Sequence, residues 1–505
     1  MARKSGRGRR GRSRRQRRRA DAPPARASGG AEPATPATPA AKERRRDLRA
    51  ALLLVVAALV VFNLNGRNMG IGDTLPARFI PFAVWKAGTV RLDPVLDATR
   101  QGYPYSYWIQ RASDGGHASM YPIVAPLLAA PLYAPAAAYL ASRAWPPAQL
   151  SWAGEVMEKV SGSCIAAVAS GLMFLLLRRR MGFRRAVLLA AAFALGTETW
   201  VIGSQALWQH GTAELLLVVA LLAVTGPPTA TGLLLAGGAC GLVIANRPFD
   251  LPLAAAFALY APLWAGGRRA LWFFLAAAVP IALALAYNLA TFGELGGGYA
   301  IAIKSTGSPS FFTHPIGRGL IEMLFSPGKG LFPFTPFLLF LFLPLFRRRP
   351  PAAPDPRPAA AQAAGTERWR QLAPIRWLQA EPGRALTVCL LAGIVAQWVL
   401  YSPTDWRAGS CYGPRFLTDL LPLAVWMLGP VVEALRGAAF VVFIAAVVFS
   451  IAVQAIGAFC YPRGGSDVHI NLEHSSLPGY VIEARAGIVR PPWLNRILPA
   501  TGSSR

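Results

Sequence analysis

Long apolar runs recur along most of this chain and constrain its fold more than any other feature. A helix needs about 20 mostly apolar residues to cross a hydrocarbon core of about 30 Å. Only 15% of the residues are charged, whereas soluble chains carry about 25%. The sequence therefore predicts an all-α integral membrane protein. We expect about eleven spans, at roughly 48–64, 156–177, 186–203, 212–225, 231–246, 249–265, 270–289, 332–346, 385–401, 417–435 and 437–459.

Residues 1–47 form a basic head with almost no aliphatic side chains. Arginine clusters alternate there with Gly, Ser, Ala and Pro, a composition typical of disorder. Up to Arg49 the chain carries 17 basic and 4 acidic residues. A polybasic arm before an apolar segment favours the cytoplasmic face and attracts anionic lipids. We predict no nucleic-acid partner, because nothing beside the arm could read bases.

Basic clusters set the expected orientation, because cytoplasmic loops are enriched in Lys and Arg. If the head is cytoplasmic, the clusters within 178–185, 268–269 and 347–349 are cytoplasmic too. This predicts a multi-pass protein of the plasma membrane with a cytoplasmic N-terminus and an external C-terminus. Residues 347–384 would form a flexible cytoplasmic loop, and residues 460–505 a short external tail.

One apolar segment, residues 119–141, resists this count. Proline removes the N–H that a helix interior needs, and prolines interrupt this segment almost every turn. A span here would also move the arginines within 178–185 to the outside. We therefore interpret the segment as a juxtamembrane or re-entrant element on the outer face. It belongs to one long first outer loop, residues 65–155.

Polar side chains gather near the span ends that this topology places outside. Ionisable groups next to lipid are costly and usually face a cavity or one another. The distribution therefore predicts an outward-facing polar site built from sequence-distant segments. Among its members are Asp73, Arg78, His210, Glu214, Arg247, Asp250, Lys329 and Arg415.

Together these features resemble the GT-C glycosyltransferases, and within them the protein O-mannosyltransferases and the lipid A aminoarabinose transferases. The shared features are a first span that leads into an acidic motif, a long outer loop with a Pro-rich juxtamembrane helix, and about eleven spans. The resemblance covers about residues 65–430, is more architectural than motif-identical, and leaves out the head. It implies a GT-C-like transmembrane domain over residues 48–459.

The resemblance also implies roles for particular residues. The family's acidic residue at the start of the first outer loop acts as catalytic base or holds the acceptor, and it falls on Asp73 in GIGDTLPAR. The family more often has Asp-Glu there, whereas this chain has Gly72-Asp73-Thr74. The missing second carboxylate weakens the case for a metal site. We therefore assign no metal-binding residue and leave open whether a divalent metal is a cofactor. The polar residue of the second outer loop falls on His210 or Glu214, and the basic residue after the fifth span on Arg247.

Sugar transfer from a lipid phosphate needs a base for the acceptor hydroxyl and cations for the leaving phosphate. Asp73 is the candidate base, since Asp93 and Asp114 of the same loop lie farther from the membrane boundary. Guanidinium and ammonium groups suit phosphate oxygens, and the candidates are Arg415, Arg247 and Lys329. The sugar or acceptor pocket would be shaped by Arg78, Tyr121 of the Ser119-Met120-Tyr121-Pro122 motif, His210 and Glu214.

Each assignment has a structural alternative. Asp73 could cap the helix that starts near Pro76. The three cations could reach to lipid headgroups, and His210 could be a hydrogen-bonded structural residue. Cys411 and Cys460 both fall in external segments, so a single disulfide between them is a further alternative.

The expected function is transfer of a sugar from a polyprenyl-phosphate donor to a glycan, lipid or protein acceptor on the outer membrane face, by inverting displacement. One alternative is a transporter or flippase of a lipid-linked saccharide, and another is a noncatalytic envelope scaffold. The sequence contains no GxxxxGK(S/T) phosphate loop and no HExxH motif. ATP-driven transport is thereby disfavoured.

Overall fold

The computed structural model describes residues 39–100, 107–306, 312–346, 378, 383–407, 411–462 and 477–485. The chain divides into two units, residues 1–45 and residues 46–505, and the contacts below lie within the second. Most of the predicted head and of the loop 347–384 lies outside the described residues, as does most of the tail 460–505.

The first described helix begins inside the predicted head. α1 covers Pro39–Asn63, whereas the sequence predicts disorder up to residue 47 and a span from residue 48. Ala, Lys, Glu and Arg fill residues 40–46, and all four are good helix formers. The prediction of disorder is therefore wrong for residues 39–47.

Helices make up nearly all of the regular structure among the described residues. Six of these helical segments are long and apolar enough to cross a membrane. Five coincide with expected spans, and the sixth is the proline-rich segment that we interpret as juxtamembrane. The protein is thus an all-α protein with membrane-type helices, and the count of eleven spans stays a prediction. The six segments are Val124–Ala141, Pro147–Arg178, Gly267–Phe292, Arg384–Tyr401, Arg415–Ala434 and Gly437–Cys460.

Several expected spans are shorter or broken in the structure. The run 186–203 is divided between α7, which ends at Leu195, and a π-helical turn, η4, Thr199–Gly203. The run 332–346 is divided into three short elements, because Pro333, Pro336 and Pro344 cannot donate the helical backbone bond. Two further expected spans are apolar helices of 16 and 17 residues, α8 and α9.

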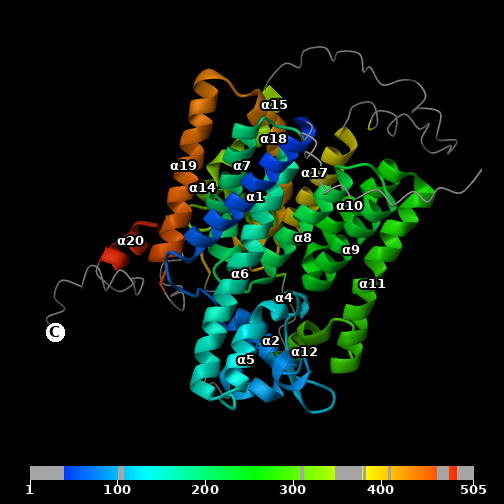
Figure 1. Cartoon of the computed structure of the whole chain (residues 1–505), viewed down its shortest axis with the longest axis vertical. Coiled ribbons are helices and arrows are strands. Elements are labelled where there is room, and N and C mark those ends of the chain that lie inside the picture. Colours follow the sequence, from blue (N-terminus) through cyan, green and yellow to red (C-terminus); the bar gives the residue numbers. More distant parts are fainter. Residues whose placement is uncertain are drawn as a thin grey trace, which may run out of the picture. The chain divides into compact units, whose positions relative to one another are not determined.

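Residues 72–100 and 107–141 fold into a small lobe of short elements, named the lobe. Phe79, Phe82 and Tyr133 are fully buried in its apolar cluster. Its two strands pair antiparallel, with Ile109 opposite Ser119. Figure 1 shows α2, α4 and α5 of the lobe, together with α12, at one end of α6 and α11. The lobe consists of η1 Gly72–Thr74, α2 Leu75–Ala87, η2 Asp93–Val95, α3 Leu96–Arg100, β1 Ile109–Arg111, β2 His117–Ser119, α4 Val124–Ala129, η3 Ala130–Tyr133 and α5 Ala134–Ala141.

The other helices pack into a bundle around one large apolar core. Within it α9 lies beside α8 and α11, α10 lies beside α17, and α6 lies beside α7 and α8. The remaining elements are α6 Pro147–Arg178, α7 Phe183–Leu195, α8 Gln209–Val224, α9 Ala230–Asn246, η5 Pro248–Asp250, α10 Leu251–Ala265, α11 Gly267–Phe292, α12 Gly297–Thr306, α13 Ile316–Phe325, α14 Leu331–Phe334, η6 Pro336–Phe342, α15 Leu343–Phe346, α17 Arg384–Tyr401, η9 Arg415–Leu420, α18 Leu421–Ala434, α19 Gly437–Cys460 and α20 Leu477–Arg485.

Helix α6 separates an arginine cluster from the lobe. Near its N-terminal end Glu158 pairs with Arg78 of the lobe. At its C-terminal end Arg178 pairs with Asp47, and Arg185 donates to the carbonyl oxygen of Leu435. The arginines that we expect to be cytoplasmic therefore lie at the opposite end of α6 from the lobe. Each of the five cysteines, all of them within the described residues, is a free thiol.

The contact between α9 and α11 yields a stability prediction. A Cβ atom on Gly237 would overlap the backbone carbonyl of Phe273, whereas one on Gly238 would meet nothing within 4 Å. Gly237→Ala should therefore lower stability by about 1–3 kcal/mol, since overpacking forces the backbone apart. Gly238→Ala is the matched control and should be neutral or stabilising, because Ala favours the helix. Thermal unfolding in detergent measures both; a Gly237→Ala protein that melts with the wild type would contradict this packing.

Candidate active site

Asp73 lies at the centre of a cluster of polar side chains. It belongs to η1, directly before α2. Its Oδ1 accepts hydrogen bonds from the hydroxyls of Tyr107 and Tyr121, the latter at 2.6 Å. Its Oδ2 lies 3.0 Å from Nη1 of Arg415. The N-cap residue of α2 is Thr74, and no side chain caps this helix. The Asp73 carboxylate therefore does not cap α2; it accepts hydrogen bonds from Tyr107, Tyr121 and Arg415 instead.

The partners of Asp73 keep its carboxylate ionised. Burial by itself would raise the pKa of Asp73, but the Arg415 charge and the hydrogen bonds from Tyr107 and Tyr121 outweigh it and leave the pKa below its usual value of 3.8. Burial, and next the negative charge of Asp73, raise the pKa of both phenols. Around neutral pH the site therefore holds a charged carboxylate and two protonated phenols.

Aromatic rings enclose Arg415. The residue begins η9, after a turn at Gly413 and Pro414 in which Gly413 has a positive φ of 63°. Its guanidinium carbon lies 4.9 Å from the ring centroid of Trp208 and 5.0 Å from that of Phe416. Such cation–π contacts strengthen when water is excluded, and only 10% of this side chain is exposed. Arg415 is therefore held in place on several sides.

A second guanidinium, that of Arg247, lies against the same Phe416 ring, 5.8 Å from its centroid. Its Nε lies 3.1 Å from Oδ2 of Asp419. Its Nη1 lies 3.2 Å from Nε2 of His210, and its Nη2 donates to the Tyr401 hydroxyl at 2.7 Å. Of the five N–H groups of an arginine, one on each terminal nitrogen has no acceptor among the described residues. Arg247 is thus positioned by the protein and retains two donors.

His210 connects Arg247 to Asp419. Its Nδ1 lies 3.0 Å from both carboxylate oxygens of Asp419, while its Nε2 faces Arg247. Nδ1 facing a carboxylate and Nε2 facing a donor correspond to a neutral ring protonated on Nδ1. His210 therefore acts as a hydrogen-bonded bridge, in line with the structural alternative considered for it.

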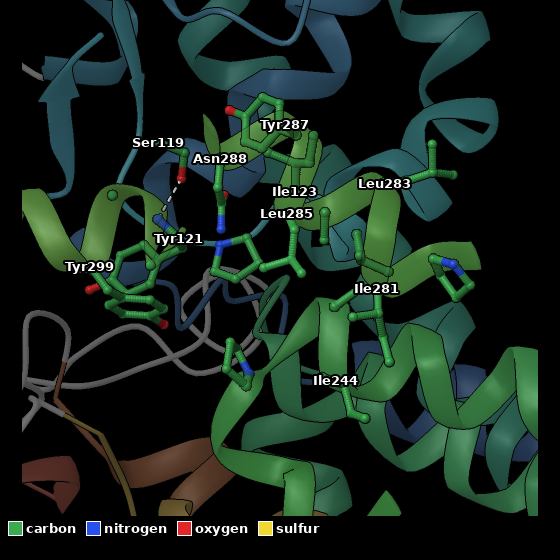
Figure 2. Close-up of a pocket in the computed structure, with 18 of the residues that line it drawn as sticks. Ser119, Tyr121, Ile123, Ile244, Ile281, Leu283, Leu285, Tyr287, Asn288 and Tyr299 are labelled. Carbon is green, nitrogen blue, oxygen red and sulfur yellow. Dashed lines mark hydrogen bonds between the residues drawn. The ribbon is translucent and has the colours of Figure 1, made fainter. Parts of the chain in front are cut away.

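An apolar cavity of about 370 Å³ adjoins this polar cluster. Figure 2 shows the rings of Tyr121 and Tyr299 at one edge, the aliphatic side chains of Ile281 and Leu283 at the other, and Leu285 between them. The two tyrosine rings meet edge to face at 5.7 Å. The cavity is bounded by the lobe, by α9 with the turn that follows it, by α11 and by the segment around α12.

The cavity touches both the polar cluster and the outer surface of the helices. Ala245 and Pro248, which line it, flank Arg247 in the chain, and Tyr121 reaches from it to Asp73. Two other lining residues, Leu127 and Leu283, are 41% and 67% exposed. The cavity therefore extends from the Tyr121 ring, whose hydroxyl bonds Asp73, to an apolar side face of the protein, and neither guanidinium lines its wall.

The structure brings some of the predicted site residues together and places others elsewhere. Asp73, Arg415 and Tyr121 are in direct contact, and Arg247 and His210 adjoin them. Lys329 donates to the carbonyl oxygen of Arg407 at 2.8 Å. Glu214, one turn deeper in α8 than His210, accepts from Thr199 at 2.7 Å. Arg78 pairs with Glu158 at 2.6 Å and donates to Asn68, so it holds the lobe on α6 and makes no described contact with Asp73.

Three members of the cluster were missed by sequence reasoning: Tyr107, Tyr401 and Asp419. Asp419 carried a usable signal, because it is a carboxylate at the start of an apolar run, as Glu214 is. Tyr107 and Tyr401 carried none, since tyrosines near membrane boundaries are common. Their role becomes visible only through the distances to Asp73 and Arg247.

The donor set does not fit a divalent metal at Asp73. Within the described part of the chain, no group of three or more His, Cys, Asp or Glu side chains is placed to hold one. Both oxygens of Asp73 accept hydrogen bonds from protein donors, and one of these donors is a cation.

We compared the chain with known protein families, curated proteins and solved structures. No protein-family model, no curated protein and no solved structure matches the chain. Its function is therefore inferred from the site.

The Arg247 network yields a second stability prediction. Asp419→Ala removes the nearer of two carboxylates that pair with the buried Arg247, at 3.1 Å against 3.6 Å for Asp250. Breaking a buried pair costs about 3–5 kcal/mol, and we expect a loss at the low end of this range because Asp250 stays. Asp405→Ala is the control, since the Asp405 side chain is 56% exposed and its partner Arg407 is also near solvent; we expect a change within about 0.5 kcal/mol. Thermal unfolding in detergent measures the stability of both variants. Equal losses of stability in Asp419→Ala and Asp405→Ala would show that Asp419 does not hold Arg247.

Proposed function

We propose that this chain is a GT-C-type glycosyltransferase that moves a sugar from a polyprenyl-phosphate donor to an acceptor on the outer face of the plasma membrane. It would have about eleven spans, with the N-terminus in the cytoplasm and the lobe outside. The proposal rests chiefly on one observation: Tyr121 lines an apolar cavity that extends to the side of the helices, and its hydroxyl bonds an ionised carboxylate, Asp73, that is paired with one guanidinium and lies near a second.

The cavity supports a lipid-linked donor. Its wall is almost wholly apolar, with Ile244, Ile281 and Leu285 among its members, and such a wall suits a polyprenyl chain. The exposed side chains along α11, including Leu275 and Val279, continue from it. A chain entering beside Leu283 would therefore remain in contact with apolar surface along its length.

Arg247 supports phosphate binding at the polar end of the cavity. It lies between two cavity-lining residues, Ala245 and Pro248, and it retains two N–H donors in the fork geometry that matches phosphate oxygens. Arg415, by contrast, is bonded to Asp73. We therefore assign phosphate binding mainly to Arg247, and to Arg415 the task of holding Asp73 ionised beside the sugar.

The reaction would be an inverting displacement. The acceptor oxygen attacks the anomeric carbon, and its proton passes to the Asp73 carboxylate. The bond from the anomeric carbon to the phosphate oxygen breaks, and the polyprenyl phosphate leaves with the electron pair. Arg247 offsets the developing phosphate charge in a site that excludes water. Base and leaving group then lie on opposite faces of the sugar, as inversion requires.

Asp73→Asn should abolish transfer. General-base catalysis contributes about 10²- to 10⁴-fold, and we expect a loss in this range. The Asn side chain leaves the Arg415 charge unpaired, so the melting temperature should also fall, and activity is therefore assayed at a temperature at which the variant is still folded. Purified protein is assayed with a panel of polyprenyl-phosphate hexoses, pentoses and N-acetylhexosamines, and cell envelopes with and without the protein are compared by mass spectrometry. Asp114→Asn, at an exposed position, is the control and should retain activity. If Asp73→Asn gave unchanged product, only the transporter and scaffold alternatives would remain.

Filling the cavity should weaken donor binding. Ala284 lines the cavity, whereas Ala286, on the same helix, is exposed and does not. Ala284→Phe should reduce the affinity for polyprenyl phosphate by about tenfold, because displaced apolar contact is worth about 25 cal/mol per Å². Ala286→Phe should leave it unchanged. Thermal stabilisation by added polyprenyl phosphate reports binding, and equal affinity in both variants would remove the cavity from the donor site.

A further inference from the structure

Tyr107 is the most exposed partner of Asp73. Its residue is 52% exposed, whereas Arg415 is buried and Tyr121 packs against Tyr299. Its backbone is anchored, because Gln110 donates to the carbonyl oxygen of Tyr107 at 2.7 Å and the neighbouring Trp108 accepts from the backbone of Met120. The side chain can therefore leave Asp73 for solvent without disturbing the β1–β2 pair.

The Tyr107 hydroxyl holds the solvent-facing acceptor position on Asp73, the position that an acceptor hydroxyl arriving from water reaches first. A general base has to accept a hydrogen bond from the proton that it removes. Each carboxylate oxygen offers about two acceptor positions. Oδ1 of Asp73 receives two phenols, and Oδ2 receives an N–H of Arg415, whose side chain is buried on that side. Replacing Arg415 would strand a buried charge, and replacing Tyr121 would disrupt the cavity wall. Displacing the Tyr107 hydroxyl from Asp73 leaves no buried charge unpaired and leaves the cavity wall intact.

We infer that Tyr107 occupies the acceptor-hydroxyl position of the resting site and is displaced by the acceptor, so that it acts as a positioning residue that also keeps water from Asp73. This inference rests on the proposed function. It identifies the acceptor group as a neutral hydroxyl that approaches from the solvent side of the lobe. It also explains how a reactive donor escapes hydrolysis while no acceptor is present.

Loss of this hydroxyl would expose Asp73 to water. A water oxygen then attacks the anomeric carbon and its proton passes to Asp73. The bond to the phosphate oxygen breaks, releasing free sugar and polyprenyl phosphate. In the wild type the Tyr107 hydroxyl occupies this position, and only an acceptor that forms further contacts displaces it.

Tyr107→Phe tests the inference with a nearly isosteric change. We expect hydrolysis of the donor, measured without acceptor, to rise about tenfold, and the KM for the acceptor to fall about fivefold, since no hydrogen bond to a charged group must first be broken. Tyr121→Phe removes the other phenol, whose position on Oδ1 lies beside the cavity and not beside solvent. It should therefore raise donor hydrolysis, and change the acceptor KM, much less than Tyr107→Phe does. Tyr139→Phe, at an exposed residue of α5, controls for loss of a distant hydroxyl, and thermal unfolding verifies that all variants fold.

The pH profile separates displacement from a change in basicity. Asp73 is faced by Arg415 of η9 and by Tyr107 and Tyr121 of the lobe, with Tyr299 of α12 and His210 of α8 farther away. Either phenol helps to lower the pKa of Asp73, so removing either raises it. The base works when ionised, and the acid limb of kcat/KM should therefore move to higher pH in both variants. Tyr107→Phe should also change hydrolysis and acceptor KM, by much more than Tyr121→Phe.

The two levels of the proposal fail in different ways. If the wild type transfers sugar and Tyr107→Phe leaves hydrolysis and acceptor KM unchanged, or raises that KM, Tyr107 does not occupy the acceptor position. If Tyr121→Phe produces the same increase in hydrolysis, the effect comes from general opening of the site and the inference is wrong. If the wild type and Asp73→Asn are equally inactive on every donor, the proposed function itself fails.

Discussion

The ion pair between Asp73 and Arg415 joins the lobe to the helix bundle across 342 positions of sequence. Neither charge would be stable alone at this depth, because an unpaired buried ion costs several kcal/mol. The pair therefore constrains where the lobe sits: η1 must meet η9 for both charges to be neutralised. Burial of the pair, the aromatic rings around Arg415 and the low pKa of Asp73 all follow from that meeting.

A second ion pair holds the lobe from its other side. Arg78 of α2 pairs with Glu158 of α6 at 2.6 Å, and Glu158 also accepts from Asn68 in the segment that leads to Asp73. Asp73 thus lies between two anchored points, five residues from Arg78 and beside Arg415. In the proposed reaction, a base fixed in this way would need little reorganisation before it reacts. The role of Arg78 is then to hold the lobe, although the sequence suggested a place in the pocket.

The contact between the lobe and the helix bundle also forms the boundary between the polar cluster around Asp73 and the apolar cavity. Tyr121 and Tyr299 have their rings at the cavity, and Tyr121 directs its hydroxyl to Asp73. Tyrosine suits such a boundary because one end is apolar and the other forms hydrogen bonds. Three carboxylates, Asp73, Asp250 and Asp419, meet two guanidinium groups there. An anionic phosphate lipid would approach the cations from the apolar side and the acceptor would approach Asp73 from water.

The sequence by itself determined that the chain is helical and apolar, and it identified Asp73, Arg247, His210 and Arg415 as candidates. Both conclusions depend on local properties: an apolar run is visible along the chain, and a charge beside it is costly whatever its partner. Only the tertiary structure decided which charges meet. The pairing of Asp73 with Arg415, the withdrawal of Arg78 to Glu158, and the parts of Tyr107, Tyr401 and Asp419 depend on contacts between distant segments. No pattern within a single segment encodes those contacts, because they arise from how the helices and the lobe pack.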